Sequence, residues 1–450
     1  MAMRRRRRGR ARPLLLLVVV ALAAALCGCA GTTTGGAVSV LASWSGAEEQ
    51  QFRAVLDAFT RETGIKVHYQ GTRALSQVLH TEVQKGTPPD VAVLPSPGEL
   101  ALYARRGDLR PLDDVLDPAQ ERTYSRQWRK LERAGTENRY GVAVKADVKS
   151  LVWFSPRHLR MARAPGTWDE LLALGRQAPA GVAPWCMGMG APPTSGWPGT
   201  DWIEDILLHQ SGVDAYQRWV DGRLAWSSPE VRRAWAAWAA VTAPGSVRGG
   251  AGSALLTDFG DAGRPMLAER PGCLLDHQAS FVMAVYQGYD EVGGRQPTPG
   301  EDFDFVPFPD SRGPEASASR VWEVSADLAG MFNDTPEARR LVRFLASTRG
   351  QEIWPGIEGA SAFSVNREVD HRVYRDDVRR RVAEVLTGED TLCFDASDLM
   401  PAAMRNAFYR AVLEFLADPG RLDALLADLD RVKQGVASGE WLGFSCAKAE

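Results

Sequence analysis

The apolar positions of residues 37–94 follow strand and helix periods in turn. The run Val38–Leu41 predicts a short strand, and apolar residues spaced three and four apart in Phe52–Phe59 predict a helix that ends at Gly64. The same succession continues with a strand at 65–69, a helix at 75–83 and a strand at 91–94. This βαβαβ order predicts a parallel, doubly wound sheet and therefore an α/β fold.

The rest of the chain adds further strands and then helices. Residues 142–154 (VAVKADVKSLVWF) predict two extended segments, and residues 167–170 (TWDE) have the pattern of a helix N-terminus. We expect further strands at 273–278, 303–308 and 321–332, and a helix at 335–347. From Asp370 onward the pattern is almost wholly helical.

Three stretches are candidates for a binding site. Ligands of doubly wound sheets bind outside the carboxyl ends of the strands, which selects the loops Ser43–Gly46 and Pro95–Gly98. The third stretch, Pro184–Gln210, is rich in Gly and Pro, which cannot build a core, so we expect its Trp197 and Trp202 to face a ligand. Indole faces beside acidic acceptors suit a ligand with apolar ring faces and many hydroxyls, which describes a sugar.

The first 28 residues have the composition of an export signal. Seven arginines precede the 13-residue apolar run Leu14–Leu26, which is shorter than the roughly 20 residues of a membrane-spanning helix. The run ends in Leu-Cys-Gly-Cys, which resembles the bacterial lipobox and implies lipidation of Cys29. Ordinary signal cleavage, with Cys29 uninvolved, is the alternative. With Cys29 lipidated, residues 29–36 would form a flexible tether between the lipid and the folded part.

The charge of the chain argues against nucleic acid as a partner. The 450 residues, 45% hydrophobic and 24% charged, predict two or three domains at roughly 100–200 residues each. The formal net charge is −3, and loss of the seven signal arginines leaves 46 basic against 56 acidic residues, a net charge of −10. An acidic protein lacks the basic surface that the phosphate backbone requires.

The cysteines also favour export. With Cys29 lipidated, an even number remains, as expected in an oxidising compartment. Three pairings are possible. We favour Cys186–Cys273, because both flank stretches assigned to one site, and Cys393–Cys446. A zinc site is the alternative, but no C-x-x-C motif or nearby histidine supports it.

Motifs of catalysis are missing from the sequence. It holds no G-x-x-x-x-G-K-[ST], no G-x-S-x-G and no H-E-x-x-H, so we expect no metal, no cofactor and no enzymatic activity. Glycoside hydrolysis is the main enzymatic alternative and needs two carboxylates about 5–9.5 Å apart across the scissile bond. Asp201 and Asp205 share one helix face and would lie side by side. A non-binding structural surface lipoprotein is the third interpretation.

A family resemblance spans nearly the whole chain after the signal. It is carried, in order, by KGTPPDVAVLPSPGEL (85–100), KSLVWFSP (149–156), TWDEL (167–171), PWCMGMG…GWPGTDWIEDILL (184–208), TDFGDAGRPML…GCLLDHQASF (257–281) and FDASDLMP (394–401). These stretches resemble the extracellular solute-binding proteins (family 1) of bacterial carbohydrate ABC transporters, and specifically the α-glucoside-binding group.

The resemblance implies a type II periplasmic-binding-protein fold. Two α/β lobes with doubly wound sheets would be joined by a hinge, with a largely helical C-terminal portion. Residues 37–147 with about 301–350 would form the N-terminal lobe, and 148–300 with 351–450 the C-terminal lobe. An α-glucoside such as maltose or trehalose, or a related oligosaccharide, would be held between them without catalysis.

The resemblance also assigns ligand-binding residues. They are Trp44, Ser45, Ser96, Trp153, Trp197, Asp201, Trp202, Gln278, Phe281 and Asp327. Two stretches depart from the family pattern, because Ser325 replaces a usual glycine before Asp327 and Gly359–Ser364 is altered.

Partners and location follow from the same resemblance. We expect an oligosaccharide ligand, the transmembrane subunits of an ABC permease and contact with the membrane through the lipid anchor only. The protein would be a monomer, exported and lipid-anchored to the outer face of the bacterial cell membrane.

Overall fold

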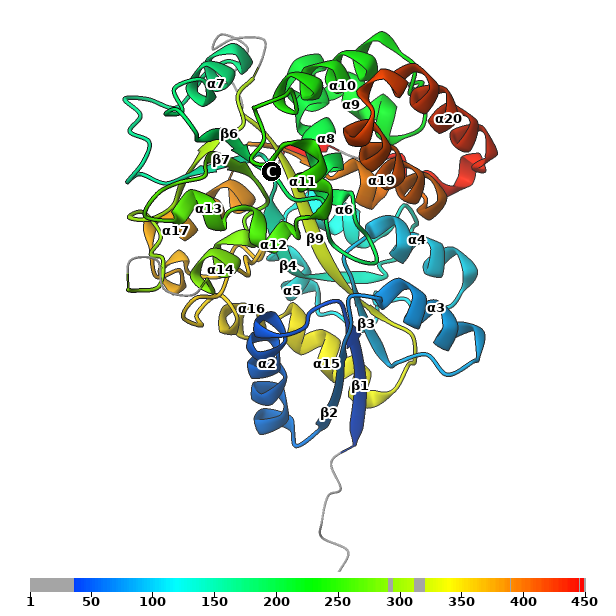
Figure 1. Ribbon diagram of the computed structural model, residues 1–450. Coiled ribbons are helices and arrows are strands. Elements are labelled where there is room, and N and C mark those ends of the chain that lie inside the picture. Colours follow the sequence, from blue (N-terminus) through cyan, green and yellow to red (C-terminus); the bar gives the residue numbers. More distant parts are fainter. Residues whose placement is uncertain (1–35, 290–293, 311–319, 389, 445, 449–450) are drawn as a thin grey trace, which may run out of the picture.

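Two β-sheets lie in two parts of the molecule, stacked along its long axis in the computed structural model (Figure 1). The structure describes residues 36–289, 294–310, 320–388, 390–444 and 446–448. Cys29 and the predicted signal lie outside these residues. The long strand β9 (Val321–Met331) runs from the lower part, which holds the N-terminal strands, into the upper part.

The first sheet contains the predicted βαβαβ unit. Its strands are β1 (Ala37–Ala42), β2 (Lys66–Gly71), β3 (Val91–Leu94), β4 (Gly141–Val148), β9, β10 (Thr391–Phe394) and β11 (Cys446–Lys448). Their order is β11-β10-β9-β3-β1-β2, with β4 also pairing with β9. β1 pairs in parallel with both β2 and β3, as predicted. Gly64 ends the first helix in the left-handed conformation (φ 74°), also as predicted.

Strand β9 runs through the connection between the two parts. It pairs antiparallel with β3 through Leu328–Met331 and in parallel with β10 through Val321–Val324. β4 lies antiparallel along it, with a shift of register between Ala143 and Lys145. The polar residues of β4 and β9 therefore lie side by side where the chain crosses between the parts.

The second sheet lies in the upper part, and sheet membership differs from the expected lobe boundaries. Its order is β6-β7-β5-β8, formed by β5 (Leu151–Phe154), β6 (Ala183–Cys186), β7 (Cys273–His277) and β8 (Asp304–Pro307). β8 was expected in the N-terminal lobe but pairs with β5. β10 and β11, expected in the C-terminal lobe, join the first sheet because β10 pairs with β9. The region after Asp370 is therefore less uniformly helical than its pattern indicates.

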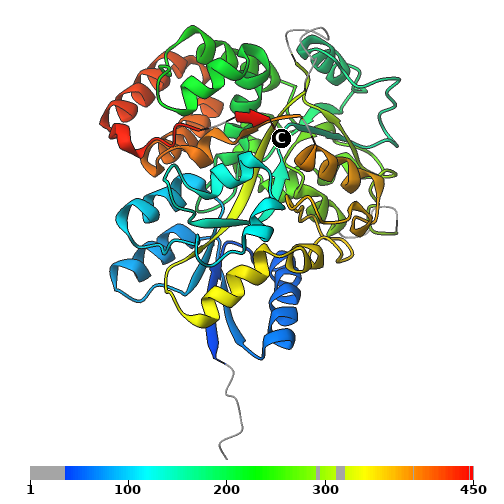
Figure 2. The same cartoon turned by 180° about the vertical axis from the view of Figure 1, so that it is seen from behind.

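Helices cover both sheets (Figures 1 and 2). Around the first sheet lie α2 (Ala47–Thr63), α3 (Leu75–Gln84), α4 (Pro97–Arg106), α5 (Pro118–Arg122), α6 (Arg126–Glu132), α15 (Pro336–Ala346) and α16 (Thr348–Ile353). The upper part holds α7 (Trp168–Gly175), α8 (Trp197–Ser211), α9 (Val213–Val220), α10 (Pro229–Val241), α11 (Gly250–Leu256), α12 (Phe259–Ala262), α13 (Arg264–Leu267), α14 (Val282–Gln287), α17 (Asp377–Thr387), α18 (Ala396–Leu399), α19 (Ala402–Ala417) and α20 (Leu422–Gly435). α8 packs against α10 and α19.

Both favoured disulfides are present. Cys186 is bonded to Cys273, which joins β6 to β7, and Cys393 is bonded to Cys446, which joins β10 to β11. Each bond links neighbouring strands of one sheet. The second bond fixes the C-terminal strand to the strand that leads into α18.

Candidate ligand-binding site

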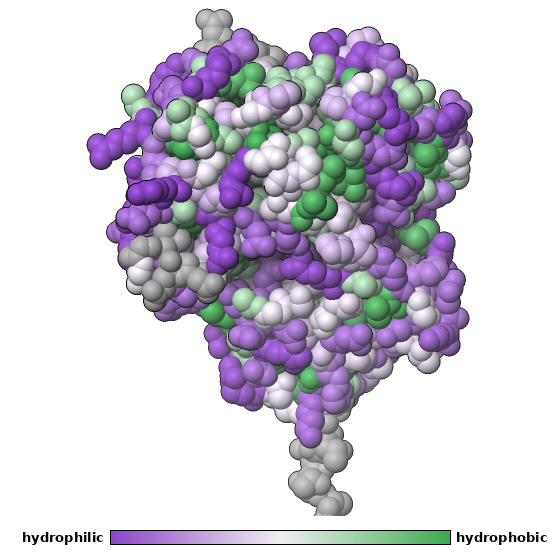
Figure 3. Space-filling model, viewed as in Figure 1, coloured by the Kyte–Doolittle hydropathy of each residue, from purple (hydrophilic) through white to green (hydrophobic). Residues whose placement is uncertain are grey.

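A pocket of about 270 Å³ lies between the two parts of the molecule. The space-filling view shows a hollow with largely hydrophilic surroundings between the lower and upper parts (Figure 3). Loops after β1 and β3 line one side, at the carboxyl ends of these strands as predicted. The loop before α8, together with Phe259, Phe281 and residues of α19, lines the other side, and β4 and β9 pass between them.

The loop before α8 is shaped by close contact with α19. Gly196 has a φ of 106°, and a Cβ at this position would lie 2.4 Å from the carbonyl oxygen of Tyr409. Only glycine fits there, because a side chain would clash and the backbone conformation is unfavourable for other residues. The glycine thus allows Trp197 to begin α8 directly beside the pocket.

Aromatic rings form an apolar part of both walls. On the side of the first sheet, Trp44 contacts Trp354 edge-on, with ring centroids 4.7 Å apart. On the opposite side, the ring centroid of Trp197 lies 5.0 Å from that of Phe259 and 5.9 Å from that of Phe281. Trp197 is only partly buried, so its ring remains available to a ligand.

Charged groups from the crossing strands form the floor of the pocket. Lys145 Nζ lies 2.8 Å from Glu48 Oε1 and 3.5 Å from Asp147 Oδ2. Burial alone would lower the pKa of Lys145, but Asp147, Glu48 and Asp327 together raise it above its usual value. Burial raises the pKa of Asp327 to about 7, against the opposing effect of Lys145. These groups can both donate and accept hydrogen bonds.

A second cluster of charged side chains lies near α18 and α19. Lys149 Nζ contacts Asp395 and lies 3.0 Å from Asp201 Oδ1. Burial and the neighbouring Asp395 raise the pKa of the pocket-lining Asp398 well above its usual range. Arg405, also at the pocket, lies 3.5 Å from Glu99. Among the described residues, the pocket is lined by four acidic and four basic side chains, so its formal charges balance.

The structure places half of the expected ligand-binding residues on the pocket wall. These are Trp44, Ser45, Trp197, Phe281 and Asp327. They come from both sides and from β9, so the pocket brings together residues that are almost 300 positions apart.

Three of the other expected residues are tryptophan or glutamine side chains buried behind the wall. Trp153 is fully buried against Tyr286, Phe303 and Phe305, and its Nε1 donates to the backbone carbonyl of Gln278 at 2.8 Å. Trp202 is 2% exposed and packs against Trp185 and His277. Both indoles fill the core because they point from their strand or helix away from the pocket. Gln278 is likewise buried.

Ser96 and Asp201 support the pocket from behind. Ser96 Oγ accepts from Glu99 N at the start of α4 and donates to the carbonyl oxygen of Asp398. Asp201 is 2% exposed and its carboxylate is paired with Lys149. Burial is the larger cause of its raised pKa of about 7, and Lys149 opposes it.

The carboxylates expected of a hydrolase are not arranged for one. Within the described chain, neither Asp201 nor Asp205 lines the pocket. Asp205 accepts a hydrogen bond from Ser150 Oγ, and its Oδ2 lies 2.8 Å from His277 Nε2. Both acids are buried in polar contacts with the protein itself, and the pair cannot lie on either side of a bound glycosidic bond.

Sequence reasoning missed most of the charged pocket. Lys145, Asp147 and Lys149 lie in or next to β4, and Arg405 and Tyr409 lie on α19. One signal was present: Lys145 and Asp147 interrupt an otherwise apolar strand, and buried charges in such strands are rare unless paired. The positions on α19 carry no comparable local signal.

Comparisons with known proteins identify the family of the chain. The model of the family described as bacterial extracellular solute-binding protein matches residues 43–352. The osmoprotective compounds-binding protein GgtB of Synechocystis sp. is 33% identical over 84% of this chain and 88% of its own length. The alpha-glucosides-binding periplasmic protein AglE of Rhizobium meliloti is 32% identical over 86% of this chain and 85% of its own length.

Solved structures share the fold. A chitin oligosaccharide binding protein has a TM-score of 0.72 at 16% identity and covers 88% of this chain and 98% of its own. The maltose-bound MalE3 protein of T. maritima has a TM-score of 0.65 at 16% identity and covers 90% of this chain and 100% of its own. Among the described residues, no helix has the length and apolar character needed to cross a membrane. The chain therefore belongs to the bacterial extracellular solute-binding proteins of ABC transporters, and it is a binding protein and not an enzyme.

Proposed function

We propose that this protein binds a small neutral α-glucoside, or a related oligosaccharide, in the pocket between its lobes and delivers it to an ABC permease. The observation that carries this proposal is the composition of the pocket wall. Trp197 and Phe281 offer aromatic faces, while Glu48, Lys145 and Asp327 offer acceptors and donors. Sugars need both, because their C–H faces stack on indole rings and their hydroxyls need placed polar partners.

The balance of charge around the pocket favours an uncharged ligand. Four acidic and four basic side chains line it among the described residues, and several are already paired with each other. A strongly anionic or cationic ligand would break this balance, whereas a hydroxyl can donate to a carboxylate and accept from an ammonium group.

The size of the pocket favours a short ligand. Its volume of about 270 Å³ lies just below the usual range of ligand pockets, which is roughly 300–1,000 Å³. One or two sugar rings suit this volume better than a long oligosaccharide. The α-glucoside class is supported by the similarity to AglE, and the similarity to GgtB makes osmoprotective compounds the second class to test.

Capture would couple ligand binding to lobe closure. The pocket takes its lining from both sides and from the two crossing strands β4 and β9. Ligand contacts to both sides exist together only in the closed form, so binding energy favours closure, as in other periplasmic binding proteins. The closed form would be recognised by the permease, with the protein held at the cell membrane through lipid on Cys29 and acting as a monomer.

A thermal-shift screen tests the proposal. The panel contains maltose, trehalose, longer α-glucosides, β-linked glucosides and polyhydroxylated osmoprotectants. We expect an α-linked disaccharide to give the largest rise in melting temperature, without any hydrolysis product by chromatography. A screen in which no sugar raises the melting temperature would favour the structural lipoprotein, and release of product would favour the hydrolase.

A further inference from the structure

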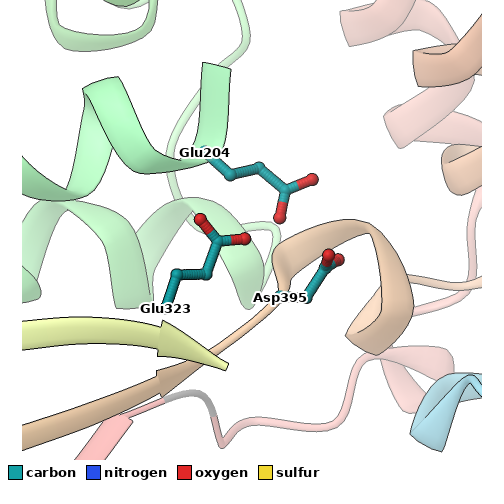
Figure 4. A group of neighbouring side chains, drawn as sticks. All are labelled: Glu204, Glu323 and Asp395. Carbon is teal, nitrogen blue, oxygen red and sulfur yellow. The ribbon is translucent and has the colours of Figure 1, made fainter. Parts of the chain in front are cut away.

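Three carboxyl groups from distant parts of the chain meet in the interior behind the pocket. Glu204 comes from α8, Glu323 from β9 and Asp395 from the residue before α18 (Figure 4). One carboxylate oxygen from each lies within 4.8 Å of the other two. All three side chains are buried, with exposed fractions of at most 1%.

Two members of this carboxylate cluster are held in position by the turn at α18. Glu204 accepts hydrogen bonds from the backbone N–H groups of Ala396 and Ser397. Asp395 Oδ1 accepts from Ser397 Oγ and Asp398 N, both at 2.8 Å. These contacts fix both carboxylates, and Asp395 Oδ2 also contacts Lys149. Each carboxylate oxygen has a second lone pair and can therefore accept a further contact.

Glu323 differs from both, because its carboxylate meets another carboxyl group instead of a donor on the backbone. The side chain is 0% exposed, and neither Oε1 nor Oε2 receives a hydrogen bond from an N–H or hydroxyl group of the described residues. Its side-chain contact is with the carboxyl group of Glu204. Figure 4 shows this carboxylate pointing from the strand toward that of Glu204. A buried ionised carboxylate without such a donor is costly by several kcal/mol, so a group of this kind indicates a missing positive charge or proton.

The surroundings make the shortage of positive charge larger. Asp201 and Asp205 lie on the same helix as Glu204, and Lys149 is paired with Asp395 and Asp201. Burial and the neighbouring carboxylates raise the pKa of Glu323 and of Glu204 well above the usual range. A cation among these groups would restore the ionised form of each.

We propose that Glu204, Glu323 and Asp395 form a structural site for a hard divalent cation, with Ca²⁺ as the best-fitting ion. The ligand set is entirely carboxylate oxygen, which suits Ca²⁺, Mg²⁺ and Mn²⁺ rather than soft metals. Ca²⁺ binds oxygen at about 2.3–2.6 Å, so any two of its ligand oxygens lie at most roughly 5 Å apart, and the three oxygens here meet this condition because they lie within 4.8 Å of one another. Two bidentate glutamates and one aspartate can supply about five of its 6–8 ligands.

Such a cation would fasten the pocket wall to the rest of the protein. Ser397 and Asp398, which follow Asp395 after one intervening residue, line the pocket. Through Glu204 and Glu323 the ion would tie this turn to α8 and to the crossing strand β9. The site is separate from the proposed sugar contacts, and its existence does not depend on which ligand the pocket binds.

The test uses purified protein without sugar. After dialysis against EGTA, we expect the melting temperature to fall, and added Ca²⁺ to restore it by at least about 3 °C. Plasma mass spectrometry on protein loaded with Ca²⁺ and then desalted should find about one ion per chain. Mg²⁺ and Mn²⁺ form parallel arms, and a response to either also supports the site.

Two variants assign the effect to these residues. Glu323→Gln should abolish the Ca²⁺-dependent shift, whereas Asp276→Asn should keep it, because Asp276 is a buried carboxyl outside the cluster that accepts from Tyr286. Should Glu323→Gln fail to fold, calorimetric titration of the stripped native protein decides alone. No bound ion and no shift with any of the three cations would overturn the proposal in favour of a proton shared by the two glutamates. A shift that persists in Glu323→Gln would also overturn it.

Discussion

Ser96 Oγ donates a hydrogen bond to the backbone carbonyl of Asp398 at 2.7 Å, across 302 positions of the sequence. The bond joins the loop after β3 to the turn at α18, and residues on both sides of it, Pro95 and Asp398, line the pocket. Ser96 itself is 1% exposed and does not line the pocket. It holds one part of the wall against another.

Removal of this hydroxyl should weaken ligand binding as well as the fold. Ser96→Ala loses the cap of α4 and the bond to Asp398, so we expect a loss of about 1 kcal/mol in unfolding free energy. We also expect a roughly three- to tenfold loss in sugar affinity, the value of one hydrogen bond. Ser125→Ala is the matched control, because Ser125 caps α6 and is not part of the pocket lining. If Ser96→Ala and Ser125→Ala bind the sugar with equal calorimetric affinity, Ser96 has no role in positioning the pocket wall.

Trp197 and Trp202 should respond to substitution in opposite ways. Trp197→Ala removes a partly exposed pocket ring, so we expect sugar binding to weaken by about 1–3 kcal/mol with a small change in stability. Trp202→Ala opens a cavity in the core and should cost about 3–5 kcal/mol of unfolding free energy. Denaturant titration and calorimetry separate the two effects. Unchanged affinity in Trp197→Ala would remove that ring from the site.

The stability of the protein should fall as the pH rises from about 4 to about 7. Burial raises the folded-state pKa of Asp327 from 3.8 to about 7, so in this window the unfolded chain ionises first and is favoured. Asp327→Asn should make the decrease in unfolding free energy between pH 5 and pH 8 smaller. The control is Asp370→Asn, because Arg372 lowers the pKa of the exposed Asp370 to about 2, outside this window. If the unfolding free energy decreases equally between pH 5 and pH 8 in Asp327→Asn and in the native protein, Asp327 is not the group responsible.

The lipid anchor is tested in cells. Cys29→Ala should release the protein in soluble form outside the cell membrane, because the chain would lose the residue proposed to carry the lipid. Fractionation of the native and variant proteins measures this directly. Retention of the variant in the membrane fraction would show that another feature anchors it.

Local periodicity was sufficient for the elements of the first sheet that follow one another in sequence. β1, β2 and β3 appear as predicted because their apolar runs and the helices between them are defined by neighbouring residues. β10 was missed because its four residues form a strand by pairing with β9, which lies about 70 positions earlier, and with β11, which lies later in the chain. The lobe boundaries stay a prediction, since the sheet that β8 and β10 join depends on non-local pairing.

The site was predictable where the loop positions carried the signal. Trp44 and Trp197 lie at a strand end and at a helix start, and both line the pocket. Trp153 and Trp202 were expected at the same site but are buried in the core, and the packing of β5 and α8 decides this. Lys145 and Lys149 reach the pocket because β4 pairs antiparallel with β9. No local sequence pattern predicts this pairing, so the location of the two lysines could not be predicted.

Calorimetric titration with maltose and cellobiose tests the α-glucoside proposal most directly. The two disaccharides have the same composition and ring size and differ in the configuration of the linkage, so only the shape of the pocket can separate them. We expect maltose to bind at least about tenfold more tightly, a difference of about 1.4 kcal/mol, and to lose most of this advantage in Trp197→Ala. Equal affinities, tighter binding of cellobiose or no binding of either sugar would contradict the proposal.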